Sequence, residues 1–111
     1  MRYYDGLYRC DVELLRRVFH PDARYITVAD GAYKNLDMPT YLAIIAQRES
    51  PSARGDPFER SIESIEIAGD CSICVFNCAM LGRRFIDYLT LIRTGGEWRI
   101  ISKAFHAFPA S

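Results

Sequence analysis

Apolar residues recur at helical spacing in the first part of the chain. Between residues 3 and 19 they keep close to the 3.6-residue period of an amphipathic helix, at Tyr3, Leu7, Leu14, Leu15 and Val18. Asp11 interrupts the pattern and is a favoured N-cap residue. Pro21 disfavours helix at His20, the residue before it. The segment therefore predicts two short helices, or one kinked helix, that end near Phe19.

β-branched and aromatic residues dominate the segment that follows. Residues 23–29 predict a strand, Asp30-Gly31 is a turn signal, and residues 32–36 predict a short second strand. Asp37 can cap a helix whose first turn tolerates Pro39. The apolar side of that helix consists of Tyr41, Leu42, Ile44 and Ile45. Residues 49–57 are rich in Ser, Pro and Gly and predict a loop.

The rest of the chain has the pattern of an antiparallel sheet. Strands are predicted from Phe58 to residue 68 and over residues 71–80, 83–92 and 98–108, with turn signals at Gly69, Gly82 and Gly95-Gly96. Helices and strands are therefore largely segregated along the sequence, which indicates an α+β fold rather than a parallel α/β sheet. The length of 111 residues fits one domain, which we place at residues 1–111.

The last hairpin allows a strand register to be predicted. If Gly95-Gly96 is a two-residue loop, Thr94 lies opposite Glu97. Continued without interruption, this register pairs Leu91 with Ile100, Leu89 with Ser102, Asp87 with Ala104 and Phe85 with His106. One face of the two strands then carries Phe85, Asp87, Leu89, Leu91, Trp98, Ile100, Ser102, Ala104 and His106.

The other face of these strands is also apolar. It carries Ile86, Tyr88, Thr90, Ile92, Ile101, Lys103 and Phe105 in the same register. An antiparallel sheet that packs one face on helices usually leaves its second face to solvent. A face this apolar needs a cover, and the simplest cover is a second copy of the chain. We therefore predict a homodimer formed through the sheet face.

Charge and hydropathy exclude some partners. The fourteen basic and fourteen acidic side chains cancel, and a neutral chain without a basic stripe argues against nucleic acid as a partner. No apolar run approaches the roughly 20 residues that span a bilayer, so we expect no membrane association. Residues 1–10 lack the apolar segment of a signal peptide, and the expected location is cytoplasmic.

Three of the four cysteines lie close together but do not predict a metal site. Cys71, Cys74 and Cys78 fall in a β-prone segment. On a strand Cys71 and Cys74 point to opposite faces, whereas a structural zinc site needs paired thiolates on a tight turn. With Cys10, they are expected to be free thiols of a reducing compartment. We predict no metal and no cofactor.

Two segments resemble a known superfamily. Residues 2–23 resemble the opening of nuclear transport factor 2-like domains, because they combine a helix, a break before Asp11 and an exit of the form Phe-x-x-Asp-Ala. Residues 87–101 resemble the closing hairpin of these domains. The resemblance is greatest to bacterial SnoaL-like (polyketide-cyclase-like) proteins and those labelled "putative lumazine-binding". It implies a curved sheet wrapped around helices, a pocket at the wide end and dimerisation through the sheet. It also implies a longer first helix than this chain has, so we expect the pocket to be less covered at that end.

Ketosteroid isomerase belongs to the same superfamily and offers a comparison of sites. The resemblance places Tyr3 and Asp87 where the isomerase has the tyrosine and the protonated aspartate of its oxyanion hole. The general base of the isomerase falls on Thr27, which cannot accept a proton at neutral pH. Asp30 lies beyond the strand end and faces the other way. Isomerase chemistry of that type is therefore not expected.

Candidate site residues follow from the predicted register and the resemblance. Asp87 and His106 are diagonal neighbours on one predicted face and form the best acid–base pair, although Asp87 could instead be a buried carboxylate held by Ser102 or His106. We expect the ligand-binding residues to be Tyr3, Tyr8, His20, Trp98 and Ser102. For His20, a structural role in the turn that leaves the helix is the alternative.

The sequence favours a small-molecule-binding domain with a mainly apolar or aromatic pocket, because the fold implies a pocket but the catalytic set is incomplete. Its expected partner is a small apolar or aromatic molecule. Two alternatives stay open. One is a cofactor-independent enzyme of the polyketide-cyclase, dehydratase or isomerase type that uses Asp87 and His106. The other is a protein-interaction module that works through the sheet face.

Overall fold

The computed structural model describes residues 2–48, 50–55, 59–80 and 82–109, and for residues 2–5, 51, 54 and 80 it describes the backbone alone. Phe58, where the third strand was expected to begin, lies outside the described residues. The elements are α1 (Arg2–Arg9), α2 (Val12–Val18), β1 (Phe19–Ala29), β2 (Ala32–Asp37), α3 (Met38–Gln47), α4 (Pro51–Arg54), β3 (Glu59–Ala68), β4 (Cys71–Met80), β5 (Arg83–Thr94) and β6 (Glu97–Ala107).

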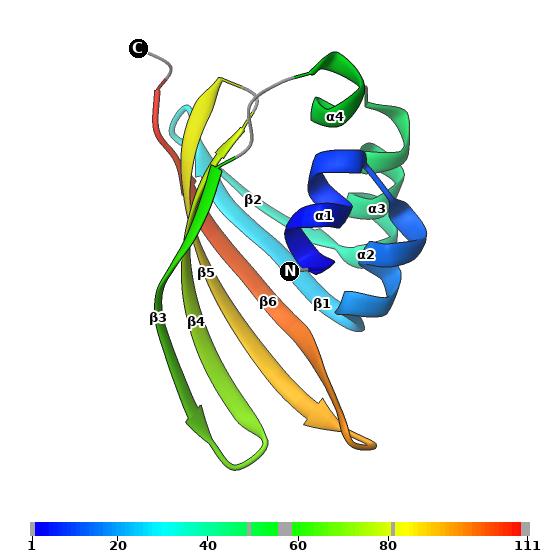
Figure 1. Ribbon diagram of the computed structural model, residues 1–111, viewed down its shortest axis with the longest axis vertical. Coiled ribbons are helices and arrows are strands. Elements are labelled where there is room, and N and C mark those ends of the chain that lie inside the picture. Colours follow the sequence, from blue (N-terminus) through cyan, green and yellow to red (C-terminus); the bar gives the residue numbers. More distant parts are fainter. Residues whose placement is uncertain (1, 49, 56–58, 81, 110–111) are drawn as a thin grey trace.

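The six strands form one curved sheet with the helices on its concave side (Figure 1). The strand order is β2-β1-β6-β5-β4-β3, and every neighbouring pair is antiparallel except β1 and β6, which run parallel. The helices lie over the β1 and β6 side of the sheet, whereas β3 forms the far edge (Figure 1). The α+β class expected from the sequence is confirmed, and so is the cone-like architecture, a curved sheet wrapped around helices, that the superfamily resemblance implied.

The first helical segment is broken where the sequence indicated. Cys10 has a positive φ of 51°, and the Asp11 carboxylate accepts a hydrogen bond of 3.1 Å from the backbone N–H of Leu14 as the N-cap of α2. The two helices pack so closely that a Cβ on Gly6 would come within 2.7 Å of the Leu15 side chain. Gly6 is therefore required by the close approach of α1 to α2.

Strand β1 begins earlier than the sequence predicted, at Phe19 instead of Ala23. The buried Phe19 pairs with Ile100 of β6, and the register shifts before pairing resumes at Arg24. The intervening His20-Pro21-Asp22 segment was expected to be a turn outside the strand. Pairing with β6 overrides this local preference, and the irregular register accommodates the proline, which cannot donate to the ladder.

The next turns and caps follow the sequence. Asp30 and Gly31 take positive φ values of 52° and 77° in the hairpin between β1 and β2. The Asp37 carboxylate accepts a hydrogen bond of 2.9 Å from the N–H of Thr40 and caps α3. The predicted loop at residues 49–57 differs in one respect, because its described part contains the single helical turn α4.

The β5–β6 hairpin contains a bulge that the predicted register did not include. Thr94 lies opposite Glu97 and Leu91 opposite Ile100, as expected, but Thr90 pairs with Ser102, which leaves Ile101 as an extra residue in β6. Every later side chain of β6 consequently changes face relative to β5. Leu89 lies opposite Lys103, and Asp87 opposite Phe105.

The hydrophobic core fills the space between the concave face and the helices. Its buried members are Leu7, Leu15, Phe19, Ala23, Met38, Tyr41, Leu42, Ile45, Cys74, Phe76, Cys78, Leu89 and Ile100. The convex face, by contrast, leaves large apolar side chains exposed, among them Val28, Tyr33, Ile73 and Tyr88. On the edge strand β3, Ile62, Ile65 and Ile67 share the concave side with Phe76 and Cys74 but remain exposed.

Among the described residues, no helix combines the length and the hydropathy that crossing a lipid bilayer requires.

Candidate functional site

A small chamber lies between the concave face of the sheet and α3, with a volume of about 50 Å³. Its walls come from helices α1 and α3 and from strands β1, β4, β5 and β6. The lining residues are Leu7, Tyr25, Tyr41, Arg48, Cys78, Phe85, Asp87, Lys103 and Phe105. The chamber combines aromatic walls with buried ionisable groups. This combination is typical of small-molecule sites, where a few placed polar groups fix the orientation of a ligand.

A wider cavity of about 740 Å³ adjoins the chamber. Four residues line both spaces: Tyr25, Arg48, Phe85 and Phe105. The wider cavity also reaches exposed residues such as Lys34 and Arg83, so it opens to the surface. We call the two spaces the inner chamber and the outer cavity. Together they offer a small polar end and a larger, more open entrance.

Lys103 is the least expected residue of the inner chamber. Only 6% of it is exposed, and its Nζ lies 4.9 Å from the ring centroid of Phe105, 5.5 Å from that of Tyr25 and 5.6 Å from that of Tyr41. An ammonium over aromatic faces is attracted by the ring quadrupoles. The three rings therefore hold the end of this side chain against the chamber.

Asp87 lies on the same face of the sheet as Lys103, one strand away. It is 3% exposed and pairs with Phe76 of β4 and Phe105 of β6. Since Lys103 pairs with Leu89, the two ionisable side chains are diagonal neighbours, which long side chains can bridge. The chamber thus contains a carboxyl group and an amine in a largely desolvated setting.

Tyr41 contributes a buried phenol from α3. It is 2% exposed, and its hydroxyl has no hydrogen-bond partner within the described part of the chain. Its ring stacks on Tyr25 with 4.4 Å between centroids. Burial raises the pKa of Tyr41 well above its ordinary value, so the hydroxyl stays protonated and is available as a donor.

The other titratable groups of the chamber are also affected by burial. Desolvation raises the pKa of Tyr25, and the nearby Lys103 opposes part of this shift. Desolvation, together with the charge of Asp87, raises the pKa of Cys78 to about 12. At neutral pH both groups are therefore protonated, and Cys78 is not a thiolate nucleophile.

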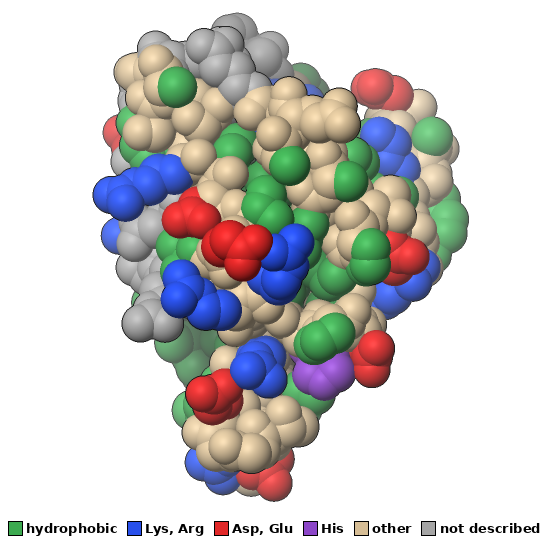
Figure 2. Space-filling model, turned by 90° about the vertical axis from the view of Figure 1, so that its right-hand side faces the viewer, with side chains coloured by type: hydrophobic (Ala, Val, Ile, Leu, Met, Phe, Trp, Pro, Cys, Tyr) green, Lys and Arg blue, Asp and Glu red, His purple; other side chains and the backbone are tan. Residues whose placement is uncertain are grey.

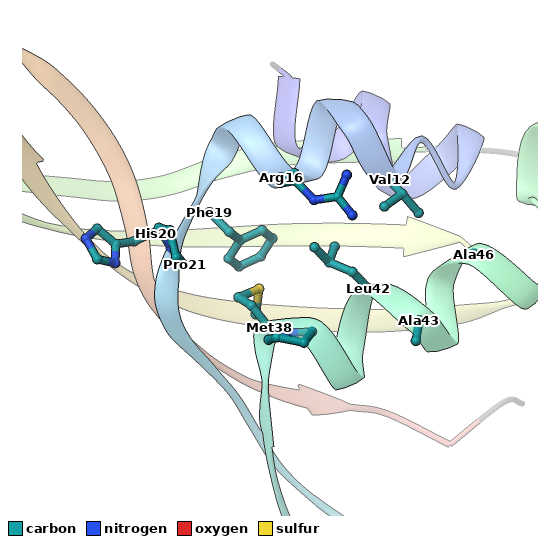
Figure 3. A pocket seen from close by; sticks show the side chains of 10 residues that line it. Val12, Arg16, Phe19, His20, Pro21, Met38, Leu42, Ala43 and Ala46 are labelled. Atoms are coloured by element: carbon teal, nitrogen blue, oxygen red, sulfur yellow. The ribbon is translucent and has the colours of Figure 1, made fainter.

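A second depression lies on the helical side of the molecule, between α2 and α3. Figure 2 shows this side, where basic and acidic side chains alternate with apolar ones. The groove has a volume of about 450 Å³. In Figure 3, Phe19, Met38 and Leu42 lie between the two helices, while His20 lies apart from them at one end. The lining of the groove is mostly apolar, whereas the buried ionisable groups line the inner chamber.

The family of the chain follows from a match that covers nearly its whole length. The model of the family described as "Putative lumazine-binding" matches residues 1–106. The chain belongs to this family. Among curated proteins, the chain is 22% identical over 109 residues to "Aldolase FrzH" from a Cladobotryum species, with 96% of the chain and 84% of that protein covered.

Solved structures similar to this chain confirm its fold. A nuclear transport factor 2-like protein of unknown function from Shewanella baltica superposes with a TM-score of 0.85 at 23% identity and covers 97% of this chain and 86% of its own. One from Silicibacter pomeroyi gives 0.81 at 24% identity, with 96% and 87% covered. A domain with a cystatin-like fold from Nostoc punctiforme gives 0.75 at 13% identity, with 94% and 69% covered. The fold that the superfamily resemblance implied is thereby confirmed.

The predicted pairing of Asp87 with His106 is wrong. In the structure, His106 lies opposite Ile86 on the convex face and makes an edge contact with Phe108, with 4.7 Å between ring centroids. The bulge at Ile101 is the cause, because one extra residue reverses the face of every following side chain. His106 therefore cannot exchange a proton with Asp87 across the chamber, although it lines the outer cavity.

The same bulge moves Ser102, which pairs with Thr90 on the convex face instead of with Leu89. Trp98 lies near the end of the hairpin, opposite Arg93, whose guanidinium carbon is 5.2 Å from the indole ring centroid. Neither Ser102 nor Trp98 lines the inner chamber or the outer cavity. Their expected role as ligand contacts is not supported by these positions.

The remaining predicted ligand contacts have different outcomes. Tyr8 is half-buried on α1 and lines neither the inner chamber nor the outer cavity. His20 lines the groove, and its Nδ1 accepts a hydrogen bond of 3.0 Å from the N–H of Asp22, a local contact of the kind expected for a structural role. The side chain of Tyr3 lies outside the described residues. Thr27, at the position of the missing base, is buried and donates a hydrogen bond of 2.7 Å to the carbonyl of Phe105.

Sequence reasoning missed Lys103, Tyr41, Tyr25 and Arg48 as chamber residues. Tyr41 and Tyr25 were recognised only as apolar members of their elements. Lys103 carried a signal, since a lysine within the apolar last strand is unusual, but the predicted register placed it on the convex face. Arg48 follows the end of α3, where a basic residue would be expected only to complement the helix dipole.

Proposed function

We propose that this domain binds a small organic molecule with a mainly apolar or aromatic body, held in the outer cavity with a polar group in the inner chamber. The observation that carries the proposal is the Tyr41 hydroxyl, which is buried without a hydrogen-bond partner among the described residues at the wall of the chamber. A buried donor that is left unpaired is costly. A ligand oxygen in the chamber would satisfy it.

Two cavity-filling substitutions test where the ligand binds. Phe85 lines both the chamber and the outer cavity, so Phe85→Trp should raise the Kd of small aromatic ketones and alcohols about tenfold or more by steric exclusion. Ala43→Trp, which fills the groove between α2 and α3, is the matched control and should leave these Kd values unchanged. Binding that is sensitive only to Ala43→Trp would place the site in the groove and contradict the proposal.

A second candidate function is cofactor-independent catalysis in the same chamber. It is favoured by the grouping of Asp87, Lys103 and Tyr41, which supplies a base and two donors for a carbonyl oxygen, and by the similarity to a protein named as an aldolase. The Asp87 and His106 mechanism is not retained. Exchange of the α-protons of a bound ketone for deuterium, followed by NMR, should occur with the native protein and disappear in Asp87→Asn if this candidate is correct.

We also propose that two copies associate through the convex face of the sheet. Support comes from the exposed apolar side chains of that face, which include Tyr88 at 54% and Val28 at 59% exposure. Adjacent strands β4 and β5 contribute Ile73 and Tyr88 to one surface. A face that apolar is typical of an interface. If the protein is a monomer in solution, the alternative is favoured that a different protein binds this face. The domain would then be an interaction module.

A reducing, cytoplasmic location remains part of the proposal. Its support is the chemistry of the four cysteines, which are free thiols in the structure. Cys74 and Cys78 are buried in the core as small apolar residues.

A further inference from the structure

Lysine is rare in this chain and its two occurrences differ in environment. Of fourteen basic side chains, only Lys34 and Lys103 are lysines, and the others are arginines. Lys34 is exposed on β2 at the outer cavity. Lys103 is 6% exposed and lines the inner chamber. Arginine cannot act as a nucleophile in proteins, whereas a desolvated lysine amine can.

The surroundings of Lys103 provide the other groups that reaction with a carbonyl compound requires. The Asp87 carboxyl and the Tyr41 hydroxyl line the same chamber as the amine. A carboxylate can accept the proton that the amine must lose, and a protonated phenol can donate a hydrogen bond to a developing oxyanion. The rings of Tyr25, Tyr41 and Phe105 around Nζ limit the access of water.

The volume of the chamber restricts what can reach the amine. About 50 Å³ holds a group of a few non-hydrogen atoms, such as a carbonyl with one small substituent. The remainder of a larger molecule would have to extend past Phe85 and Phe105 into the outer cavity of about 740 Å³. The arrangement therefore fits a ligand whose carbonyl lies near one end of an apolar body.

We propose that Lys103 forms a reversible imine with a small ketone or aldehyde whose apolar body occupies the outer cavity. This inference rests on the proposed function, since the carbonyl compound must first bind. It goes further because it assigns a covalent step to one amine and names the class of compound that undergoes it.

The step balances without a cofactor. The Lys103 ammonium gives a proton to the Asp87 carboxylate, and the freed electron pair on Nζ forms a bond to the carbonyl carbon while the carbonyl π bond breaks. Tyr41 donates a hydrogen bond to the resulting oxyanion. The carbinolamine oxygen takes up the proton lost by nitrogen and the proton held by Asp87, and leaves as water. The products are a protonated imine and one water molecule, and addition of water reverses the reaction.

Reductive trapping tests the proposal. The native protein is incubated at pH 7 with 4-phenylbutan-2-one and sodium cyanoborohydride, which reduces an imine to a stable secondary amine, and the adduct is located by peptide mass spectrometry. We expect the adduct at Lys103 to form about tenfold or more faster than at Lys34, because binding positions the ketone at the buried amine. Lys34, an exposed amine of the same molecule, serves as the reference for the reactivity of an ordinary lysine.

Three variants make the result specific. Lys103→Arg keeps the positive charge and should abolish the adduct at this position, with Lys103→Met as the second choice if the arginine does not fold. Tyr41→Phe should slow trapping at Lys103 about tenfold or more, through loss of the oxyanion donor. Circular dichroism checks that each variant is folded.

The outcomes separate this inference from the proposed function. If titration shows that the ketone binds but no adduct forms at Lys103, or if Lys34 is modified equally fast, the imine is excluded and the binding proposal stands. If the ketone neither binds nor forms an adduct, both are contradicted. A selective adduct that Lys103→Arg removes supports both.

Discussion

Asp87 of β5 and Lys103 of β6 line the same chamber only because one extra residue, Ile101, interrupts the pairing of their strands. An uninterrupted pairing from the Gly95-Gly96 turn would place these two side chains on opposite faces of the sheet. Because of the bulge, Lys103 and not His106 lies on the same face of the sheet as the Asp87 carboxyl group. It thereby changes the chemistry that the concave face can support.

The two buried ionisable side chains should stabilise each other. Asp87→Asn and Lys103→Met are each expected to lower the free energy of unfolding by about 3 kcal/mol, because each removes one partner from a desolvated pair. The double variant should lose less than the sum by about 1 kcal/mol or more. Urea unfolding of the four proteins at pH 7 measures this coupling. Lys34→Met combined with Asp87→Asn is the control, and the losses in free energy of unfolding of these two variants should add within about 0.5 kcal/mol. Equal additivity for both pairs would contradict an interaction between Asp87 and Lys103.

The unpartnered hydroxyl of Tyr41 should lower the stability of the free protein. Tyr41→Phe is expected to raise the free energy of unfolding by about 1 kcal/mol, since it removes a buried donor that has no acceptor. The same variant should bind ketones and alcohols more weakly than the native protein. Chemical denaturation and titration calorimetry measure the two effects. A loss of stability together with unchanged affinity would show that the hydroxyl serves the fold and not a ligand.

Gly6 should be sensitive to the smallest substitution. A Cβ at this position would lie 2.7 Å from Leu15 Cδ2 and 2.8 Å from Leu15 Cγ, and Leu15 is fully buried. We expect Gly6→Ala to lower the free energy of unfolding by about 1–3 kcal/mol despite the higher helix propensity of alanine. Thermal unfolding checks this value. Gly6→Ala should lower the free energy of unfolding less in a Leu15→Val background than in the native protein. A stabilising effect of Gly6→Ala would mean that α1 can move away from α2.

The convex face should carry the contacts of a homodimer. Tyr88 lies at its middle, opposite Val75 of β4 and Ala104 of β6. We expect light scattering at micromolar concentration to give twice the mass of one chain for the native protein and the mass of one chain for Tyr88→Arg, because a charge would be buried in the interface. Ile67→Arg, at a position that is 66% exposed but on the concave side, is the control and should remain dimeric. A native monomer would contradict the proposal.

Alkaline pH should destabilise the fold partly through Cys78. Its pKa of about 12 in the folded protein lies above the ordinary value of 9.0. Above pH 9 the unfolded chain therefore releases this proton while the folded chain retains it. The contribution of Cys78 to the free energy of unfolding is fully present below pH 9. Between pH 9 and pH 12 it is lost by at most about 1.4 kcal/mol per pH unit. Denaturation series between pH 8 and 10 should show a smaller loss in Cys78→Ala. Cys71→Ala, which changes an exposed thiol, should show the native loss.

Local signals along the chain were sufficient to predict every element except the single helical turn α4. Asp11 and Asp37 cap helices, and Asp30-Gly31 and Gly95-Gly96 form turns, because these residue types satisfy backbone groups or adopt positive φ without outside help. The start of β1 at Phe19 was not predicted. It depends on pairing with Ile100, a residue about 80 positions away, and no local pattern contains that contact.

The sequence by itself determined the order of helices and strands, the superfamily, the location of Asp87 among apolar neighbours, and the excess of apolar residues on both faces of the sheet. Tertiary structure alone decided which side chains meet Asp87. Side chains alternate along a strand with a period of two, so a single bulged residue reverses every assignment beyond it. That bulge arises where β6 must pair with β1 and β5 at once on a curved sheet, and this requirement belongs to the whole fold and not to any segment of the chain.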